Sequence, residues 1–119
     1  MLMTSGCGVS SDEDQVRATA ARFLSAVAAG SGTVACEQLS PALRRQLTKD
    51  QRTAACADAV LKVTLREHGV AKVRVFATAA IAELDGESLF LGLTGAGWRV
   101  DAIGCRPAGP GPYECEEQA

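Results

Sequence analysis

The five cysteines are the residues of this chain whose type and spacing point most clearly to chemistry. Cys36 and Cys56 lie 20 residues apart, Cys105 and Cys115 lie 10 residues apart, and Cys7 has no nearby partner. This partition predicts two local disulfides and one odd cysteine. In the chain-entropy model, closing loops of this size stabilises a fold by about 3 kcal/mol each.

An alternative is that the cysteines are separate thiols in an intracellular protein, because free cysteine packs like a small hydrophobic residue. The segment between Cys105 and Cys115 favours the disulfides. It contains three Pro and two Gly, so it can form neither a helix nor a central strand and would gain from a covalent closure. Disulfides persist in oxidising compartments, so this pattern predicts an exported protein.

Cys7 follows two small residues in the segment Met3-Thr4-Ser5-Gly6-Cys7-Gly8. This segment resembles the lipobox of bacterial lipoproteins, in which the cysteine is diacylated after export. Thr4 departs from the usual aliphatic residue, and the few residues before Cys7 cannot hold the charged and apolar regions of a signal peptide. We therefore expect Met1 to be internal to a longer product that is lipidated on Cys7, with residues 1–10 as signal remnant and tether. The alternative is a chance match at a frayed terminus.

Two carboxylates on predicted strands, Asp101 and Glu83, are the candidates for acid–base catalysis. A carboxylate base in an apolar cavity, assisted by a Tyr donor, serves isomerases, but strand carboxylates usually lie on a solvated face. The single tyrosine, Tyr113, is expected to anchor the Pro/Gly loop by packing on the strand ends. The single histidine, His68, has no second histidine nearby, and no cysteine lies in a C-x-x-C motif. No catalytic residue, metal site or cofactor is predicted.

Composition excludes several classes of protein. The 119 residues carry 12 basic and 14 acidic side chains, which gives a net charge of -2 and no footprint for nucleic acid. No apolar run approaches the roughly 20 residues of a transmembrane helix.

A modest basic patch is formed by Arg44, Arg45, Lys49 and Arg52. It could meet anionic envelope polymers or lipid head groups, or could simply be a solvated helix face. Residues 11–119 are predicted to form one domain.

Four helical segments are predicted in the first half of the chain. Ser11 before three acidic residues indicates a capped start, and the segment beginning at Gly30 ends the first helix. Ser40 before Pro41 indicates a second capped start, and Asp50 and Thr53 are alternative caps for the last helix. The predicted helices run from Ser11 to the residue before Gly30 and over Thr33–Leu39, Ala42–Leu47 and Ala54–Val63.

The second half changes to the alternating pattern of strands. Asp85-Gly86 predicts a tight hairpin. Asp101 is expected to share a sheet face with Arg99 and Ile103, opposite Trp98. The predicted strands are Val70–Ala77, Thr78–Leu84 with its core side at Ala80, Ala82 and Leu84, Ser88–Thr94 and Trp98–Ile103. Helices followed by an antiparallel meander predict an α+β fold, with helices packed on a four-stranded sheet.

The order of these elements, with the segment Gly95–Val100, resembles the cystatin-like cone fold of nuclear transport factor two and ketosteroid isomerase. The chain is also similar to small uncharacterised actinobacterial lipoproteins. Ser5–Gly8, Cys36–Leu43, Thr94–Val100 and the surroundings of Cys105 and Cys115 carry that resemblance. It implies a lipid-anchored domain on the outer face of the cytoplasmic membrane. It implies no catalytic residue, because no activity is established for that group of lipoproteins, and a shared fold does not supply a function.

The sequence therefore predicts an extracytoplasmic lipoprotein, tethered to the membrane through Cys7, whose sheet contacts a small apolar ligand or another envelope protein. A first alternative is a small isomerase- or cyclase-like enzyme that uses Asp101 or Glu83 as its base. A second is an intracellular protein with five free thiols.

Overall fold

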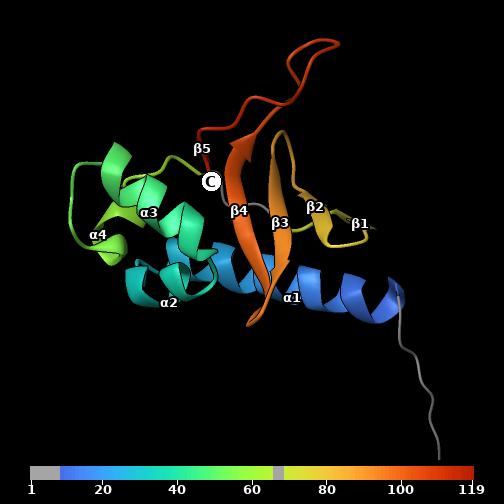
Figure 1. The fold of residues 1–119 in the computed structure, drawn as a ribbon, viewed down its shortest axis with the longest axis horizontal. Helices are drawn as coiled ribbons and strands as arrows, with labels where there is room; N and C mark the ends of the chain where they lie inside the picture. Colours follow the sequence, from blue (N-terminus) through green and yellow to red (C-terminus); the bar gives the residue numbers. More distant parts are fainter. Residues whose placement is uncertain (1–8, 66–68) are drawn as a thin grey trace, which may run out of the picture.

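The computed structural model describes residues 9–65 and 69–119, and in these residues helices precede an antiparallel sheet (Figure 1). The predicted α+β class is confirmed, with a fifth, two-residue strand added to the expected four. The helices are α1 (Val9–Ala28), α2 (Gly32–Glu37), α3 (Pro41–Asp50) and α4 (Cys56–Val60), and the strands are β1 (Lys72–Phe76), β2 (Ala79–Glu83), β3 (Ser88–Thr94), β4 (Gly97–Cys105) and β5 (Glu117–Gln118).

The helix boundaries follow local chemistry. α1 begins at Val9, so Ser11 lies inside its first turn and the predicted cap at Ser11 is wrong. The cap at Ser40 is confirmed, because the Leu43 N–H donates to the Ser40 hydroxyl oxygen at 3.1 Å. α3 continues to Asp50 and ends where Arg52 adopts a left-handed backbone with φ of 54°.

The last helix is shorter than predicted. α4 covers only Cys56–Val60 and is preceded by Ala55, whose side chain cannot cap it. Asp50 therefore ends α3 instead of starting α4. Thr53 belongs to the turn after α3, where its N–H donates to the Thr48 carbonyl at 3.1 Å.

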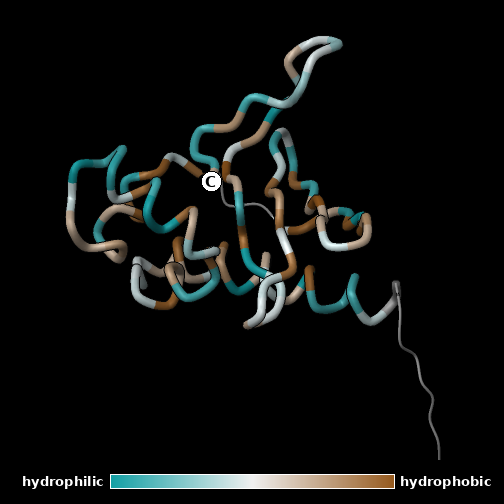
Figure 2. Tube along the Cα trace, viewed as in Figure 1, coloured by the Kyte–Doolittle hydropathy of each residue, from teal (hydrophilic) through white to brown (hydrophobic). Residues whose placement is uncertain are grey.

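The five strands are hydrogen-bonded in sequence order, and every pair is antiparallel. α1 packs across one face of this sheet and passes behind the strands in Figure 1, while α2, α3 and α4 gather beside β4, with α3 contacting β4 and β5. Ala80, Ala82 and Leu84 are buried on the α1 side, as predicted. Figure 2 shows how hydrophobic residues recur along the strands. The core between the layers includes Val16, Phe23, Leu39, Leu43, Leu47, Leu89, Leu91, Trp98 and Val100.

Two irregularities in β4 change which face its side chains occupy. Leu91 pairs with Val100 and Phe90 with Ala102, so Asp101 has no partner opposite it. A further register shift follows before Ser88 pairs with Cys105. Extra residues of this kind are β-bulges, and they interrupt the alternation of faces. Ile103 consequently lies in the core, and the prediction that it shares the face of Asp101 is wrong.

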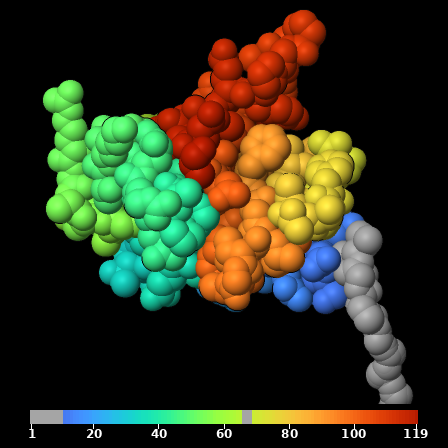
Figure 3. Space-filling view, in the orientation of Figure 1, coloured from blue at the N-terminus to red at the C-terminus, as the bar shows by residue number. Residues whose placement is uncertain are grey.

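Two disulfides cross-link the described part of the fold. Cys36 bonds to Cys56 with the Cα atoms 6.2 Å apart, and Cys105 bonds to Cys115. The first joins α2 to the start of α4, and the second closes the Pro/Gly loop that rises above β3 and β4 in Figure 3. Disulfides of this kind indicate an oxidising, extracytoplasmic compartment. Within the described ranges, no helix has the length and hydropathy needed to span a bilayer.

Candidate functional site

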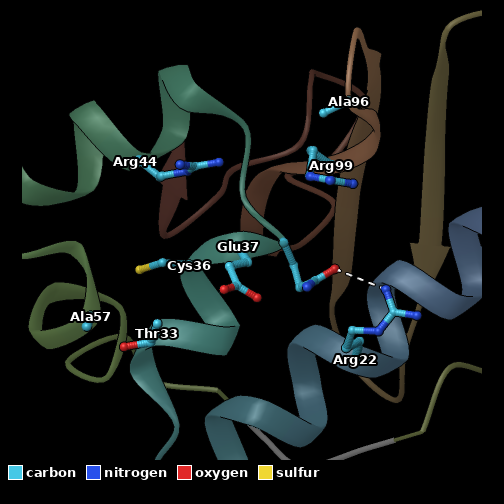
Figure 4. A pocket seen from close by; sticks show the side chains of 9 residues that line it. Arg22, Thr33, Cys36, Glu37, Arg44, Ala57, Ala96 and Arg99 are labelled. Atoms are coloured by element: carbon cyan, nitrogen blue, oxygen red, sulfur yellow. Dashed lines mark hydrogen bonds between the residues drawn. The ribbon is translucent and has the colours of Figure 1, made fainter.

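An open cleft of about 570 Å³ lies where the helices meet the edge of the sheet (Figure 4). Its walls come from all four helical segments, from the turn between β3 and β4, and from β4 itself. The lining residues are Arg22, Thr33, Cys36, Glu37, Gln38, Arg44, Ala57, Ala96 and Arg99. We call this the arginine cleft.

The three arginines of the cleft come from three different elements and are each oriented by a neutral oxygen. Arg44 of α3 donates from Nε and Nη2 to the Leu39 carbonyl at 3.2 and 3.1 Å. Arg99 of β4 donates to the carbonyl of Trp98 at 2.8 Å. Arg22 of α1 donates to the side-chain oxygen of Gln38 at 3.5 Å, the bond drawn in Figure 4.

No carboxylate of the described residues forms an ion pair with these guanidinium groups. Among residues 9–65 and 69–119, none of the three arginines takes part in an ion pair, and the ion pair between Arg74 and Glu83, at 2.8 Å, does not involve the cleft. Glu37 borders the cleft but makes no ion pair there, so the lining carries three positive charges and one negative charge. A guanidinium has five N–H donors and stays charged at all ordinary pH values. Each of the three arginines therefore keeps donors for a further acceptor.

Backbone hydrogen bonds between the segment after α2 and the edge of β4 bring the cleft residues together. The segment after α2 lies along the edge of β4: the Val100 N–H donates to the Gln38 carbonyl at 2.7 Å, and the Ser40 N–H donates to the Val100 carbonyl at 2.9 Å. Because Leu39 is thereby fixed beside β4, its carbonyl orients Arg44 of α3 in the same cleft that Arg99 of β4 lines.

The wall of the cleft that α2 and α4 form depends on the contact between these two helices. Cys36, bonded to Cys56, and Ala57 both line it. A Cβ atom at Gly32 would overlap the Ala57 carbonyl oxygen, so only glycine allows the two helices to approach this closely. The disulfide holds this approach in place.

Sequence reasoning found only part of the arginine cleft. Arg44 belonged to the predicted basic patch, but Arg45, Lys49 and Arg52 do not line the cleft and are exposed. Arg22 was recognisable only as a residue off the apolar stripe of its helix. Arg99 was recognisable only as a strand residue facing away from the core.

The candidate acid–base residues lie elsewhere. Glu83 forms the ion pair with Arg74 on the sheet face turned away from α1. Asp101 and Tyr113 line a second cavity, of about 490 Å³, on that same face. Tyr113 packs edge to face on Phe90 of β3, with ring centroids 5.2 Å apart. Its predicted role as loop anchor is confirmed, although its contact is within a strand rather than at the strand ends.

The remaining predicted residues give no further site. Cys7 and His68 lie outside the described residues. In the part of the chain that the structure describes, no group of three or more His, Cys, Asp or Glu side chains could hold a metal ion.

A buried carboxyl group at the C-terminal strand escaped the sequence analysis. Glu117 of β5 is only 5% exposed, and its Oε1 atom has no hydrogen-bond partner among the described residues. Burial, with the nearby Asp50 carboxylate as a further cause, raises the pKa of Glu117 from 4.5 to about 7, although a hydrogen bond from Gln51 opposes the shift. The signal in the sequence was only a glutamate in an acidic tail.

This pKa predicts how stability depends on pH. Between pH 4.5 and about 7 the folded chain holds a proton on Glu117 that the unfolded chain has released, so the free energy of unfolding falls as pH rises through this window. Below this window the Glu117 carboxyl is protonated in both the folded and the unfolded chain, and above it the carboxyl is ionised in both. In urea denaturation series, Glu117→Gln is expected to flatten this fall relative to the parent chain. An unchanged pH dependence in the variant would contradict the assignment.

Comparison with known protein families, with curated proteins and with solved structures finds no match to this chain.

Proposed function

We propose that this chain is an extracytoplasmic binding module, attached to the membrane through a lipid on Cys7, that captures a small ligand bearing phosphate or carboxylate groups in the arginine cleft. One observation carries the choice of ligand: guanidinium groups from three elements border one cleft, and none has a carboxylate partner within the part of the chain that the structure describes.

The chemistry of the guanidinium group supports an oxyanion as ligand. Its planar fork of N–H donors matches the oxygens of phosphate and carboxylate, and such charge-assisted pairs are stronger than neutral hydrogen bonds. Oxygens of Leu39, Trp98 and Gln38 already fix one edge of each arginine. The side chains therefore lose less freedom when the ligand binds.

Two features support the proposed location of the protein at the outer side of a membrane. Two disulfides fit an oxidising environment, and Cys7, which follows lipobox-like residues, would supply the thiol to which the lipid is attached. A single acyl chain binds membranes only marginally, so firm attachment requires the multiple acyl chains of bacterial lipoproteins.

Metabolic labelling of the producing cell with an alkynyl fatty acid tests this attachment. Label on the full-length product is expected, together with its loss in Cys7→Ser.

Calorimetric titration with inorganic pyrophosphate tests the cleft. We expect saturable binding that weakens with added salt, as for exposed charges. Arg99→Gln should weaken it by about tenfold or more, because a hydrogen bond to a charged group contributes roughly 1.5–3 kcal/mol.

Arg45→Gln is the matched control, since Arg45 is exposed on the same helix as Arg44 but does not line the cleft. It removes the same charge from the chain and should leave the affinity nearly unchanged. Equal losses in Arg99→Gln and Arg45→Gln, or no saturable heat in the parent chain, would overturn the proposed ligand site.

A further inference from the structure

We propose that the second cavity, on the sheet face turned away from α1, is a separate binding site for a quaternary ammonium group. The cavity measures about 490 Å³ and is lined by Phe90, Asp101, Ala102, Pro112, Tyr113, Cys115, Gln118 and Ala119. It shares no lining residue with the arginine cleft.

Two aromatic rings form one corner of this cavity. Phe90 projects from β3, and Tyr113 is held over it with an angle of 85° between the ring planes. The disulfide between Cys105 and Cys115 returns the Pro/Gly loop to the sheet and so brings Tyr113 to this position. The negative face of an aromatic ring attracts a cation, most effectively where water is partly excluded.

Asp101 supplies the charge that selects a cation. The bulge in β4 leaves it without a partner on β3, and its side chain is only half-buried. Its carboxylate is in no side-chain hydrogen bond or ion pair within residues 9–65 and 69–119. Gly92 makes room for it, because a Cβ atom there would overlap the Asp101 carboxylate.

The lining favours a methylated ammonium over a primary one. A primary ammonium is a compact, strongly hydrated charge, so it loses favourable hydration wherever its surroundings are apolar. Here the lining side chains offer the Asp101 carboxylate, the Gln118 amide and the Tyr113 hydroxyl, while Phe90, Ala102 and Pro112 are apolar. A quaternary ammonium donates no hydrogen bond and gains from apolar and aromatic contact, so it fits these walls better.

Nuclear magnetic resonance offers a direct test, because Tyr113 is the only tyrosine of the chain. Choline is titrated into the oxidised full chain while the ring protons of Tyr113 are followed. The comparison ligand is the uncharged isostere of choline in which carbon replaces the nitrogen. We expect a saturable shift with choline and binding of the isostere that is weaker by about tenfold, a difference of 1.4 kcal/mol.

The variants separate charge from shape. Asp101→Asn keeps the size of the side chain and should bring choline and its isostere to similar affinities. Asp85→Asn, in the exposed turn between β2 and β3, is the matched control and should retain the preference for choline. Arg99→Gln, which is expected to weaken pyrophosphate binding, should leave choline binding intact. The proposals for the two sites can therefore be refuted independently of each other.

Equal binding of choline and its isostere to the parent chain would show an apolar pocket and overturn the proposal. Retained preference for choline in Asp101→Asn would overturn it as well, as would the absence of any saturable shift of the Tyr113 ring.

Discussion

Replacing Cys36 and Cys56 together by serine is expected to lower the free energy of unfolding by about 3 kcal/mol, the entropy of a loop of this size in the unfolded chain. The same change should weaken pyrophosphate binding. Cys36 lines the arginine cleft, and its bond to Cys56 holds α2 against α4 beside Ala57. Urea denaturation measures the first effect and calorimetry the second.

The other disulfide provides the matched control. Cys105→Ser with Cys115→Ser also opens a loop and lowers stability, but neither residue lines the arginine cleft. Pyrophosphate affinity should then persist, measured at a temperature where both variants are folded. Loss of affinity in the control alone would contradict the role assigned to the bond between α2 and α4.

Truncating the single tryptophan is expected to destabilise the chain most, by about 4 kcal/mol for Trp98→Ala. Trp98 is 2% exposed and belongs to the core between β4 and α1. Its Nε1 atom donates to the Asp12 carboxylate at 3.3 Å, and its carbonyl accepts from the Thr19 hydroxyl at 3.3 Å. The side chain therefore joins β4 to α1 by both packing and hydrogen bonding.

Trp98→Phe separates these two contributions. It keeps an aromatic ring in the core and removes the bond to Asp12, which is worth about 1 kcal/mol for an ordinary hydrogen bond and more for a charged acceptor. Circular dichroism during denaturation follows both variants, since neither retains tryptophan fluorescence. A loss for Trp98→Ala no larger than that for Trp98→Phe would contradict the packing role.

Local signals in the sequence predicted much of the fold. The apolar stripe of α1, including Val16 and Phe23, faces the core because helical periodicity follows directly from the chain. Asp85-Gly86 forms the expected turn: the Leu84 N–H donates to the Glu87 carbonyl at 2.8 Å, and Gly86 has φ of 90°. Both features depend only on near neighbours in the sequence.

Features that depend on distant segments escaped prediction. β5 has two residues, too few for an alternating pattern, and exists only because β4 offers an edge to Glu117 and Gln118. The bulge at Asp101 is a property of the pairing with β3, so it is invisible in β4 alone. The arginine cleft needs α1, α3 and β4 to converge, and no local spacing relates Arg22, Arg44 and Arg99.

The account depends most on the claim that the three arginines of the cleft share one bound oxyanion. The most direct test follows the side-chain Nε–Hε signals of the arginines by nuclear magnetic resonance during titration with inorganic pyrophosphate. We expect the signals of Arg22, Arg44 and Arg99 to shift together with one dissociation constant, while those of Arg45 and Arg52 stay in place. Uniform small shifts of all arginines, or a response confined to arginines outside the cleft, would contradict the claim.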